Sequence, residues 1–263
     1  MLTEERVDEP KGFANTYHHW EGKNGAKLSK AGNWSDYAYA NEGITYLEDD
    51  GAPQLSWTAR LRNSGKGSNT AVADKDTDFL ALEAGAADGV SQALKVGDGV
   101  TVTGRNEVRV TDGGTIDIEG GKVASVRWVD VKKGGKLHGA GSVEGILYND
   151  GTVAVVPSAA AGMLMVAGDY REEEGSRLHL EIAGKGINVT GEAELAGILS
   201  VESVPRAKVG ELYEVLSAGS VTGRFANAGD RVRAGDGTEL RVGYEAGQVS
   251  LTVLSPLQLS LAE

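Results

Sequence analysis

The stretch Val110-Thr-Asp-Gly113-Gly114-Thr-Ile116 recurs 21 residues further along the chain as Val131-Lys-Lys-Gly134-Gly135-Lys-Leu137. Each copy places a glycine pair between two short runs in which apolar residues alternate with polar ones. A fixed period in the low twenties is typical of a solenoid, where one coil cannot bury its own apolar side chains and therefore stacks on its neighbours. Glycine recurs where such a coil turns with positive φ. The repeat therefore predicts stacked β-coils.

Short runs of the same period-2 type continue on both sides of this repeat. Glycine, aspartate or asparagine bounds them, as expected for strands joined by turns. An antiparallel sandwich would contain similar strands, so the fixed period is what favours a β-solenoid. The predicted organisation is a flexible lead-in over 1–19, a β-rich N-terminal cap or small sandwich over 20–93, solenoid rungs over 94–205 and a C-terminal solenoid cap over 206–263.

One stretch inside the N-terminal part, Ala81 to Ala93, has several alanines and little β character. Gly85 and Gly89 interrupt any helix longer than about two turns, because glycine is a poor helix former. We therefore expect a loop or coil there.

The composition excludes several classes of function. The 263 residues carry 26 basic and 38 acidic side chains, a formal net charge of −12, which repels polyanions and disfavours nucleic acid as a partner. No cysteine is present, which excludes thiol catalysis, cysteine zinc sites and disulfides.

The opening residues lack the apolar core of a signal peptide, so we expect that a leader was removed. No run approaches 18 apolar residues, so no membrane insertion of this chain is expected.

The run Lys136-Leu-His-Gly139-Ala-Gly141-Ser-Val143-Glu-Gly145-Ile-Leu-Tyr-Asn149-Asp-Gly151-Thr-Val153 resembles a passage near the end of autotransporter passenger domains. The later segments follow the same family order, and the resemblance covers roughly residues 94 to 254. Near the N-terminus, Trp20-Glu-Gly22 is similar to the opening of proteins with autotransporter-associated β-strand repeats.

This resemblance implies an all-β fold, a right-handed parallel β-helix with an irregular N-terminal β cap and a C-terminal capping region. It also implies a protein that is secreted or displayed at the cell surface. Members of the family include adhesins, aggregation factors, proteases and esterases, so the fold alone does not choose a function. The expected partner is a host glycoprotein, a glycan or another cell surface.

Three alternating carboxylates, Asp74, Asp76 and Asp78, are the candidate metal ligands, because hard oxygen ligands at this spacing can converge on calcium. Phe79 stands where a calcium loop needs glycine, and Gly85 where it needs glutamate, so a solvated acidic loop is the favoured interpretation. Calcium is the only cofactor that this pattern suggests. The same three aspartates are the weak catalytic candidates of a carboxylate-dependent hydrolase, either aspartic-peptidase-like or glycan-cleaving.

The aromatic residues Trp20, Trp34, Trp57 and Tyr37 are the candidate ligand-binding residues, because aromatic faces stack on sugar rings. The favoured interpretation is that they form the core of a small cap, since aromatic side chains dominate small cores.

Basic and histidine side chains give a weaker signal. Arg109, Lys132 and His138 could line one face of a glycan-cleaving β-helix, or could simply point to solvent from alternating strands. His18 and His19 fall in the predicted lead-in, and no histidine pair has the spacing of a zinc protease.

The sequence thus predicts a β-solenoid that serves as a binding, adhesion or scaffold module rather than as an enzyme. A secreted hydrolase acting on mucin-like glycoprotein or polysaccharide remains the alternative.

Overall fold

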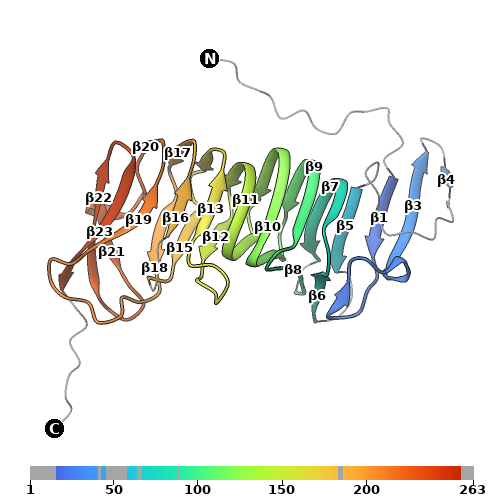
Figure 1. Cartoon of the computed structure of the whole chain (residues 1–263), viewed down its shortest axis with the longest axis horizontal. Coiled ribbons are helices and arrows are strands. Elements are labelled where there is room, and N and C mark those ends of the chain that lie inside the picture. The colour runs from blue at the N-terminus through green and yellow to red at the C-terminus, as the bar shows by residue number, and fades with distance from the viewer. Residues whose placement is uncertain are drawn as a thin grey trace, which may run out of the picture.

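The computed structural model describes residues 16–40, 43–45, 58–63, 67–87, 89–182 and 186–255. The chain is 63% strand and 3% helix and forms a β-solenoid of about 6 turns with parallel stacked coils. The coils follow one another along the long axis of the molecule (Figure 1). The all-β solenoid predicted from the repeat is therefore confirmed.

Each coil runs along three flat sides, which we call sides A, B and C, and parallel ladders join equivalent strands of successive coils. The strands of side A are β5 (Thr58–Asn63), the ends of β7 (Thr77–Ala86), β9 (Thr101–Val110), β10 (Gly114–Val131) and β11 (Lys136–Asn149), and then β14 (Tyr170–Glu172), β17 (Glu192–Leu195) and β20 (Ser220–Gly223).

Sides B and C complete each coil. The strands of side B are β2 (Ala26–Lys27), β6 (Ser68–Ala73), β8 (Ser91–Gly97), the starts of β10 and β11, β12 (Thr152–Val155), β15 (Arg177–Leu180) and β18 (Ile198–Val201). The strands of side C are the starts of β7 and β9, the middles of β10 and β11, β13 (Leu164–Ala167), β16 (Ile187–Val189) and β19 (Leu212–Ser217).

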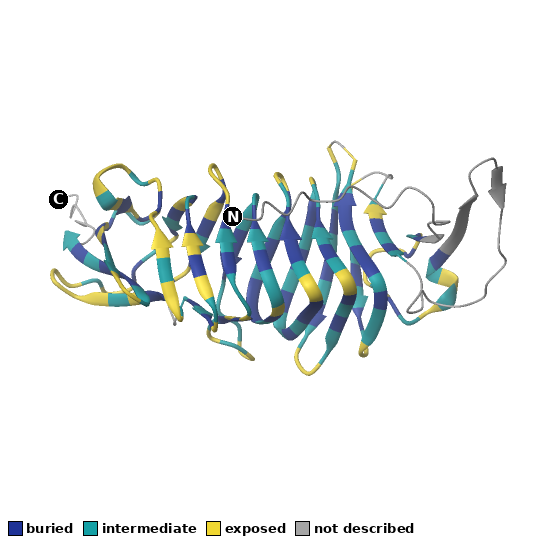
Figure 2. Cartoon of the chain, turned by 90° about the horizontal axis from the view of Figure 1, so that it is seen from above, coloured by how far each residue is buried: buried dark blue, intermediate teal, exposed yellow. Residues whose placement is uncertain are grey.

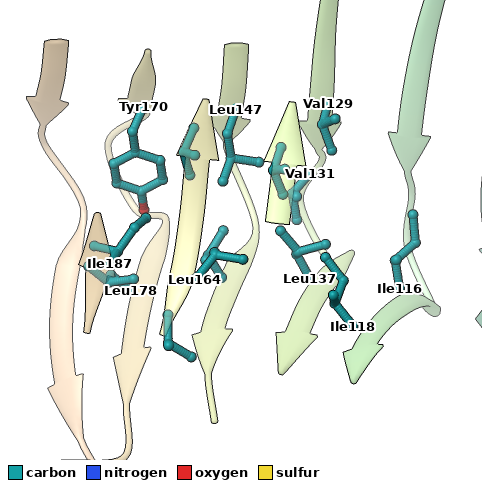
Figure 3. Close-up of a cluster of buried hydrophobic side chains, with 14 of the residues drawn as sticks. Ile116, Ile118, Val129, Val131, Leu137, Leu147, Leu164, Tyr170, Leu178 and Ile187 are labelled. Carbon is teal, nitrogen blue, oxygen red and sulfur yellow. The ribbon is translucent and has the colours of Figure 1, made fainter. Parts of the chain in front are cut away.

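The sequence repeat corresponds to one coil stacked on the next. Val110 pairs directly with Val131, and Ile116 pairs directly with Leu137. All four side chains are buried. Those of Ile116, Val131 and Leu137 lie in the interior, where apolar residues of successive coils pack together (Figure 3). Along the strands, buried residues alternate with more exposed ones (Figure 2), as the period-2 pattern predicts.

The two glycines of each repeated pair have different roles. Gly113 and Gly134 turn the chain with φ of 68° and 78°, a region that favours glycine. A Cβ atom on Gly114 or Gly135 would instead collide with a backbone carbonyl of the preceding coil, that of Ala84 or Val110. The first glycine therefore makes the corner, and the second allows adjacent coils to approach.

Antiparallel strands close both ends of the stack. At the N-terminal end, β1 (Thr16–Trp20) pairs with β3 (Trp34–Ala40), which pairs with β4 (Gly43–Thr45); a 3-10 turn over Ala31–Asn33 precedes β3. At the C-terminal end, β23 (Gln248–Ser255) pairs with β19 and with β22 (Glu239–Glu245), and β22 pairs with β21 (Arg231–Arg233), which follows a 3-10 turn over Ala228–Asp230. Such ends protect the open edges of the last coils.

The loop predicted over Ala81 to Ala93 is wrong, because this segment contains the end of β7 and the start of β8. Leu82 and Ala84 point into the core, where the ladders to neighbouring coils supply the hydrogen bonds that local propensity does not.

The parallel ladders begin where β1 pairs with β5 and β2 pairs with β6, ahead of the predicted start of the rungs at residue 94. Residues 16–19 of the predicted lead-in lie in β1, and residues 1–15 lie outside the described residues.

Substitution of Gly135 tests the close approach of adjacent coils. Gly135→Ala should lower the free energy of unfolding by about 1–3 kcal/mol, because the added methyl group meets the Val110 carbonyl. Gly97→Ala is the matched control, since a Cβ atom there meets nothing within 4 Å, and its effect should stay within about 0.5 kcal/mol. Urea unfolding followed by circular dichroism measures both. Equal effects of the two changes would contradict the role given to the second glycine.

Candidate ligand-binding face

The predicted acidic triplet is divided among separate structural contacts. The carboxylate of Asp74 accepts hydrogen bonds from the backbone nitrogen of Ser29 at 3.2 Å and from its hydroxyl at 2.7 Å, and lies 3.8 Å from the Lys27 ammonium. Partial burial acts to raise the pKa of Asp74, but the hydrogen bonds from Ser29 hold this pKa below its ordinary value. Asp74 thus joins the N-terminal segment to the coil that follows.

The other two aspartates contact the next coil. Asp76 accepts a hydrogen bond of 2.8 Å from the backbone nitrogen of Thr101, and Asp78 forms an ion pair of 2.7 Å with Arg105. Among the described residues, no three histidine, cysteine, aspartate or glutamate side chains gather where they could hold a metal ion. The three carboxylates each bind their own donors, so the structure does not bring them together as a calcium or catalytic site.

Two of the candidate aromatic residues are buried at the N-terminal end of the stack. Trp20 and Trp34 are 6% and 8% exposed and pack edge to face with their ring centroids 5.2 Å apart. Their indole nitrogens donate hydrogen bonds to Asn69 at 3.2 Å and to the Leu28 carbonyl at 2.9 Å. These two rings therefore form part of the core, which agrees with the favoured interpretation.

The remaining two aromatic candidates are not described at the level of their side chains. Tyr37 lies in β3, but its side chain is outside what the structure describes, and Trp57 is outside the described residues.

A buried polar network lies inside the solenoid near its C-terminal end. The Tyr170 hydroxyl donates a hydrogen bond of 2.8 Å to Glu172 and accepts one of 3.1 Å from the Asn149 amide. The second carboxylate oxygen of Glu172 accepts hydrogen bonds from the backbone nitrogens of Ala196 at 3.3 Å and Gly197 at 3.1 Å. The network thus joins three successive coils.

Burial dominates the electrostatics of this network. Burial raises the pKa of Glu172 above its ordinary value, although hydrogen bonds from Tyr170, the backbone and Asn149 act in the opposite direction. Burial, followed by the neighbouring carboxylate, raises the pKa of Tyr170 well above its ordinary value. Both groups are enclosed by the coils, so the network holds the coils together and does not face a ligand.

Removal of the Glu172 carboxylate tests this structural role. Glu172→Ala should lower the free energy of unfolding by about 3 kcal/mol, because three buried donors lose their acceptor and a cavity forms. Glu173→Ala removes an exposed carboxylate from the next position and should change stability by less than about 0.5 kcal/mol. Chemical denaturation of both variants at neutral pH makes the comparison. Similar stabilities would show that the network contributes nothing.

His18 lies in β1 with no exposed surface, not on a mobile segment. Burial, followed by the charge of His19, lowers its pKa to about 4. The folded protein therefore binds the proton less readily than the unfolded chain, in which histidine has its ordinary pKa of 6.5. Stability contributed by neutral His18 is present above pH 6.5 and is lost as the pH falls from 6.5 toward 4.

A nuclear magnetic resonance titration of the histidine ring protons measures this shift directly. We expect the His18 resonance to titrate near pH 4, and the free energy of unfolding to fall between pH 6.5 and 4 less steeply in His18→Asn than in the native protein. A His18 midpoint near 6.5 would contradict the burial of a neutral imidazole.

The other two histidines lie on side B. His138 is 2.8 Å from an Asp117 oxygen, and His179 is 3.0 Å from the Ser200 hydroxyl. Burial lowers the pKa of His179 below its ordinary value. His138 is therefore on a different side from Arg109, which lies in β9 on side A, and from Lys132, which follows the end of β10 on that side, so the three do not line one face.

One outward-facing column on side A alternates in charge from coil to coil. Successive members pair directly in the parallel ladders and are Arg60, Glu83, Arg109, Asp130, Tyr148, Arg171 and Glu194. Arg60 and Glu83 form an ion pair of 3.5 Å across two coils. Opposite charges on adjacent strands stabilise a sheet, whereas like charges destabilise it.

Tyr148 interrupts this column in the middle of side A, and Trp128 lies beside it in the neighbouring outward column. Trp128 and Tyr148 are partly exposed and pack edge to face, with their ring centroids 6.4 Å apart. The Arg127 guanidinium lies 5.5 Å from the Trp128 ring centre, and the Arg171 guanidinium lies 5.8 Å from the Tyr148 ring centre. We call Arg127, Trp128, Tyr148 and Arg171 the aromatic–arginine row.

The row is fixed in place by contacts beneath it. The Trp128 indole nitrogen donates a hydrogen bond of 3.3 Å to Glu107, which also pairs with Arg109 at 2.9 Å. Arg171 is 3.4 Å from Asp169. Trp128 and Tyr148 are therefore partly exposed on side A, each with a guanidinium group over its ring, an arrangement suited to binding a ring-shaped polar ligand.

Sequence reasoning did not single out this row. Trp128 and Tyr148 are separated by 20 positions in the sequence, and each looked like an ordinary outward residue of an alternating strand. Their contact depends on the register between β10 and β11, which the sequence repeat gives only approximately.

The fold and this face define the chain as a parallel β-solenoid with one aromatic, arginine-flanked outer surface. Comparisons with known protein families, with curated proteins and with solved structures found no match for the chain. Within the described ranges, no helix has the length and apolar character needed to cross a membrane.

Proposed function

We propose that this chain is a secreted or surface-displayed binding module, in which the β-solenoid is the scaffold and side A contacts host glycoprotein or glycan. The observation that carries the proposal is the partly exposed Trp128–Tyr148 pair, held on a flat side with an arginine next to each ring. The sequence resemblance of residues 94–254 to autotransporter passenger domains supports the exported location.

The chemistry of the pair suits carbohydrate. The C–H faces of a sugar ring pack on aromatic rings, while arginine donates hydrogen bonds to its oxygen atoms. The ladders hold both rings in place before a ligand arrives, so little conformational entropy is lost on binding. Stacked coils also provide a long flat surface, which can contact several sugars of an extended glycan.

No specific observation favours the hydrolase alternative. Glycan cleavage needs two carboxyl groups that face one bond from about 5–10 Å apart. Asp74, Asp76 and Asp78 instead bind Ser29, Thr101 and Arg105, respectively. A binding module needs no such pair.

Binding to immobilised mucin glycoprotein tests the proposal. The native chain should bind saturably and release the mucin intact, and Trp128→Ala should weaken binding about tenfold, as expected for the loss of a central aromatic contact of roughly 1–2 kcal/mol. Met165→Ala, which shortens an exposed apolar side chain on side C, is the matched control and should bind like the native chain.

Two results would contradict the proposal. Equal binding by the native chain and by the double variant Trp128→Ala/Tyr148→Ala would remove side A as the contact surface. Cleaved mucin fragments in mass spectra after incubation would support the hydrolase instead.

A further inference from the structure

We propose that the aromatic–arginine row selects a glycan that ends in a single carboxylated sugar, with the Arg127 guanidinium binding the carboxylate. This inference rests on the proposed function and adds the class of ligand. The rings of Trp128 and Tyr148 are nearly perpendicular, with an interplanar angle of 81°, so the sugar ring would stack on Trp128 and contact Tyr148 from the side.

Arg127 lies at a corner of β10 that is longer than the corresponding corner of β11. Ser125, Val126 and Arg127 lie between the paired residues Ala124 and Trp128, whereas only Gly145 lies at the same corner of β11, and the ladder is irregular there. A bulge of this kind redirects side chains out of a sheet. Val126 is accordingly 83% exposed.

Gly145 leaves the space beside this bulge free of side chains. Its φ of 110° favours glycine, and a Cβ atom there would collide with the backbone, so a larger residue is disfavoured. The corner of β11 therefore carries no side chain next to Arg127, whereas the corner of β9 on the other side carries Arg105 and Asn106. A ligand that stacks on Trp128 can reach the guanidinium along this open corner.

Arg127 differs in its charge balance from four cations on or next to side A. These four form ion pairs with carboxylates, namely Arg60 with Glu83, Arg109 with Glu107, Lys132 with Asp130, and Arg171 with Asp169. Arg127 is exposed, and within the described part of the chain no carboxylate forms an ion pair with it. Its positive charge is therefore available to a ligand.

A carboxylate attached to a sugar ring complements this arrangement. Arginine binds a carboxylate through two parallel hydrogen bonds, and the ring supplies the apolar face that the aromatic pair requires. The spacing of successive coils, about 4.8 Å, brings Arg127, Trp128 and Tyr148 within the span of one or two sugar units.

The net charge of the chain indicates one carboxylate rather than many. A formal charge of −12 repels a polyanionic chain, while charges farther than about 8 Å apart are largely screened at physiological salt. An otherwise neutral glycan with one terminal acidic sugar therefore gains the local attraction and avoids most of the repulsion. A sialic acid and a glucuronic acid share this chemistry.

Calorimetric titration of the native chain tests the inference with three probes: lactose, sialyllactose and a lactose capped with glucuronic acid. At least one acidic probe should bind about tenfold more tightly than lactose, the size expected for a charge-assisted hydrogen bond, and the comparison of the two identifies the sugar. Arg127→Gln should reduce the affinity for that probe to the level of lactose and leave lactose binding unchanged. Arg231→Gln, which changes an exposed arginine of the C-terminal cap, should have no effect.

The outcomes separate this inference from the proposed function. Equal affinity for lactose and both acidic probes, or an acidic preference that persists in Arg127→Gln, would overturn the selection of a carboxylate. If Trp128→Ala still weakened mucin binding in that case, the glycan-binding function would stand. Thermal unfolding of each variant confirms that the coils remain folded.

Discussion

Direct stacking of one coil on the next is the constraint on which the rest of this structure depends. Parallel ladders hold adjacent backbones about 4.8 Å apart. Two backbones cannot come this close where a side chain lies between them. The second glycine of each repeated pair, such as Gly114 or Gly135, lies against a carbonyl of the preceding coil and carries no Cβ atom that would push it away. Inward residues must then match the residues directly above and below them. Near the C-terminal end, the large ring of Tyr170 is accordingly paired with the small Ala193, and the Asn149–Glu172 pair replaces the apolar residues found earlier in the same column.

Some of this architecture was predictable because inward residues repeat. The period of 21 residues places Val110 on Val131 and Ile116 on Leu137, and the structure has these pairs in register. The loop expected over Ala81–Ala93 was wrong because alanine and glycine have low strand propensity, while the small interior of a coil accepts them once neighbouring ladders supply hydrogen bonds. Glu172 gave no signal, since it belongs to the acidic run Arg171-Glu-Glu-Glu-Gly175, which reads as an exposed turn.

The aromatic–arginine row was not predictable from the period. If the spacing of 21 held throughout, Trp128 would lie beside Asn149, which faces the interior. Two corners of β11 are shorter than those of β10, so Trp128 pairs with Ile146, and Tyr148 comes to lie on the diagonal beside it. This small change of register moves an aromatic ring next to another on the outer surface. The acidic and aromatic candidates were predicted from local sequence patterns. In the structure, Asp74 and Trp34 instead form hydrogen bonds that stabilise the N-terminal end of the stack.

Outward residues are subject to a different constraint, which is electrostatic. Two like charges stacked about 5 Å apart on a surface repel by roughly 1–3 kcal/mol, so a coil cannot copy the outward charges of its neighbour. Side A satisfies this constraint by alternating Arg60, Glu83, Arg109 and Asp130. Residues that only stabilise the stack should be balanced in this way. Arg127 lies outside the column at a corner of β10, belongs to no ladder pair and lies over the Trp128 ring. Stacking does not require its charge, which is why we assign that charge to recognition of a ligand.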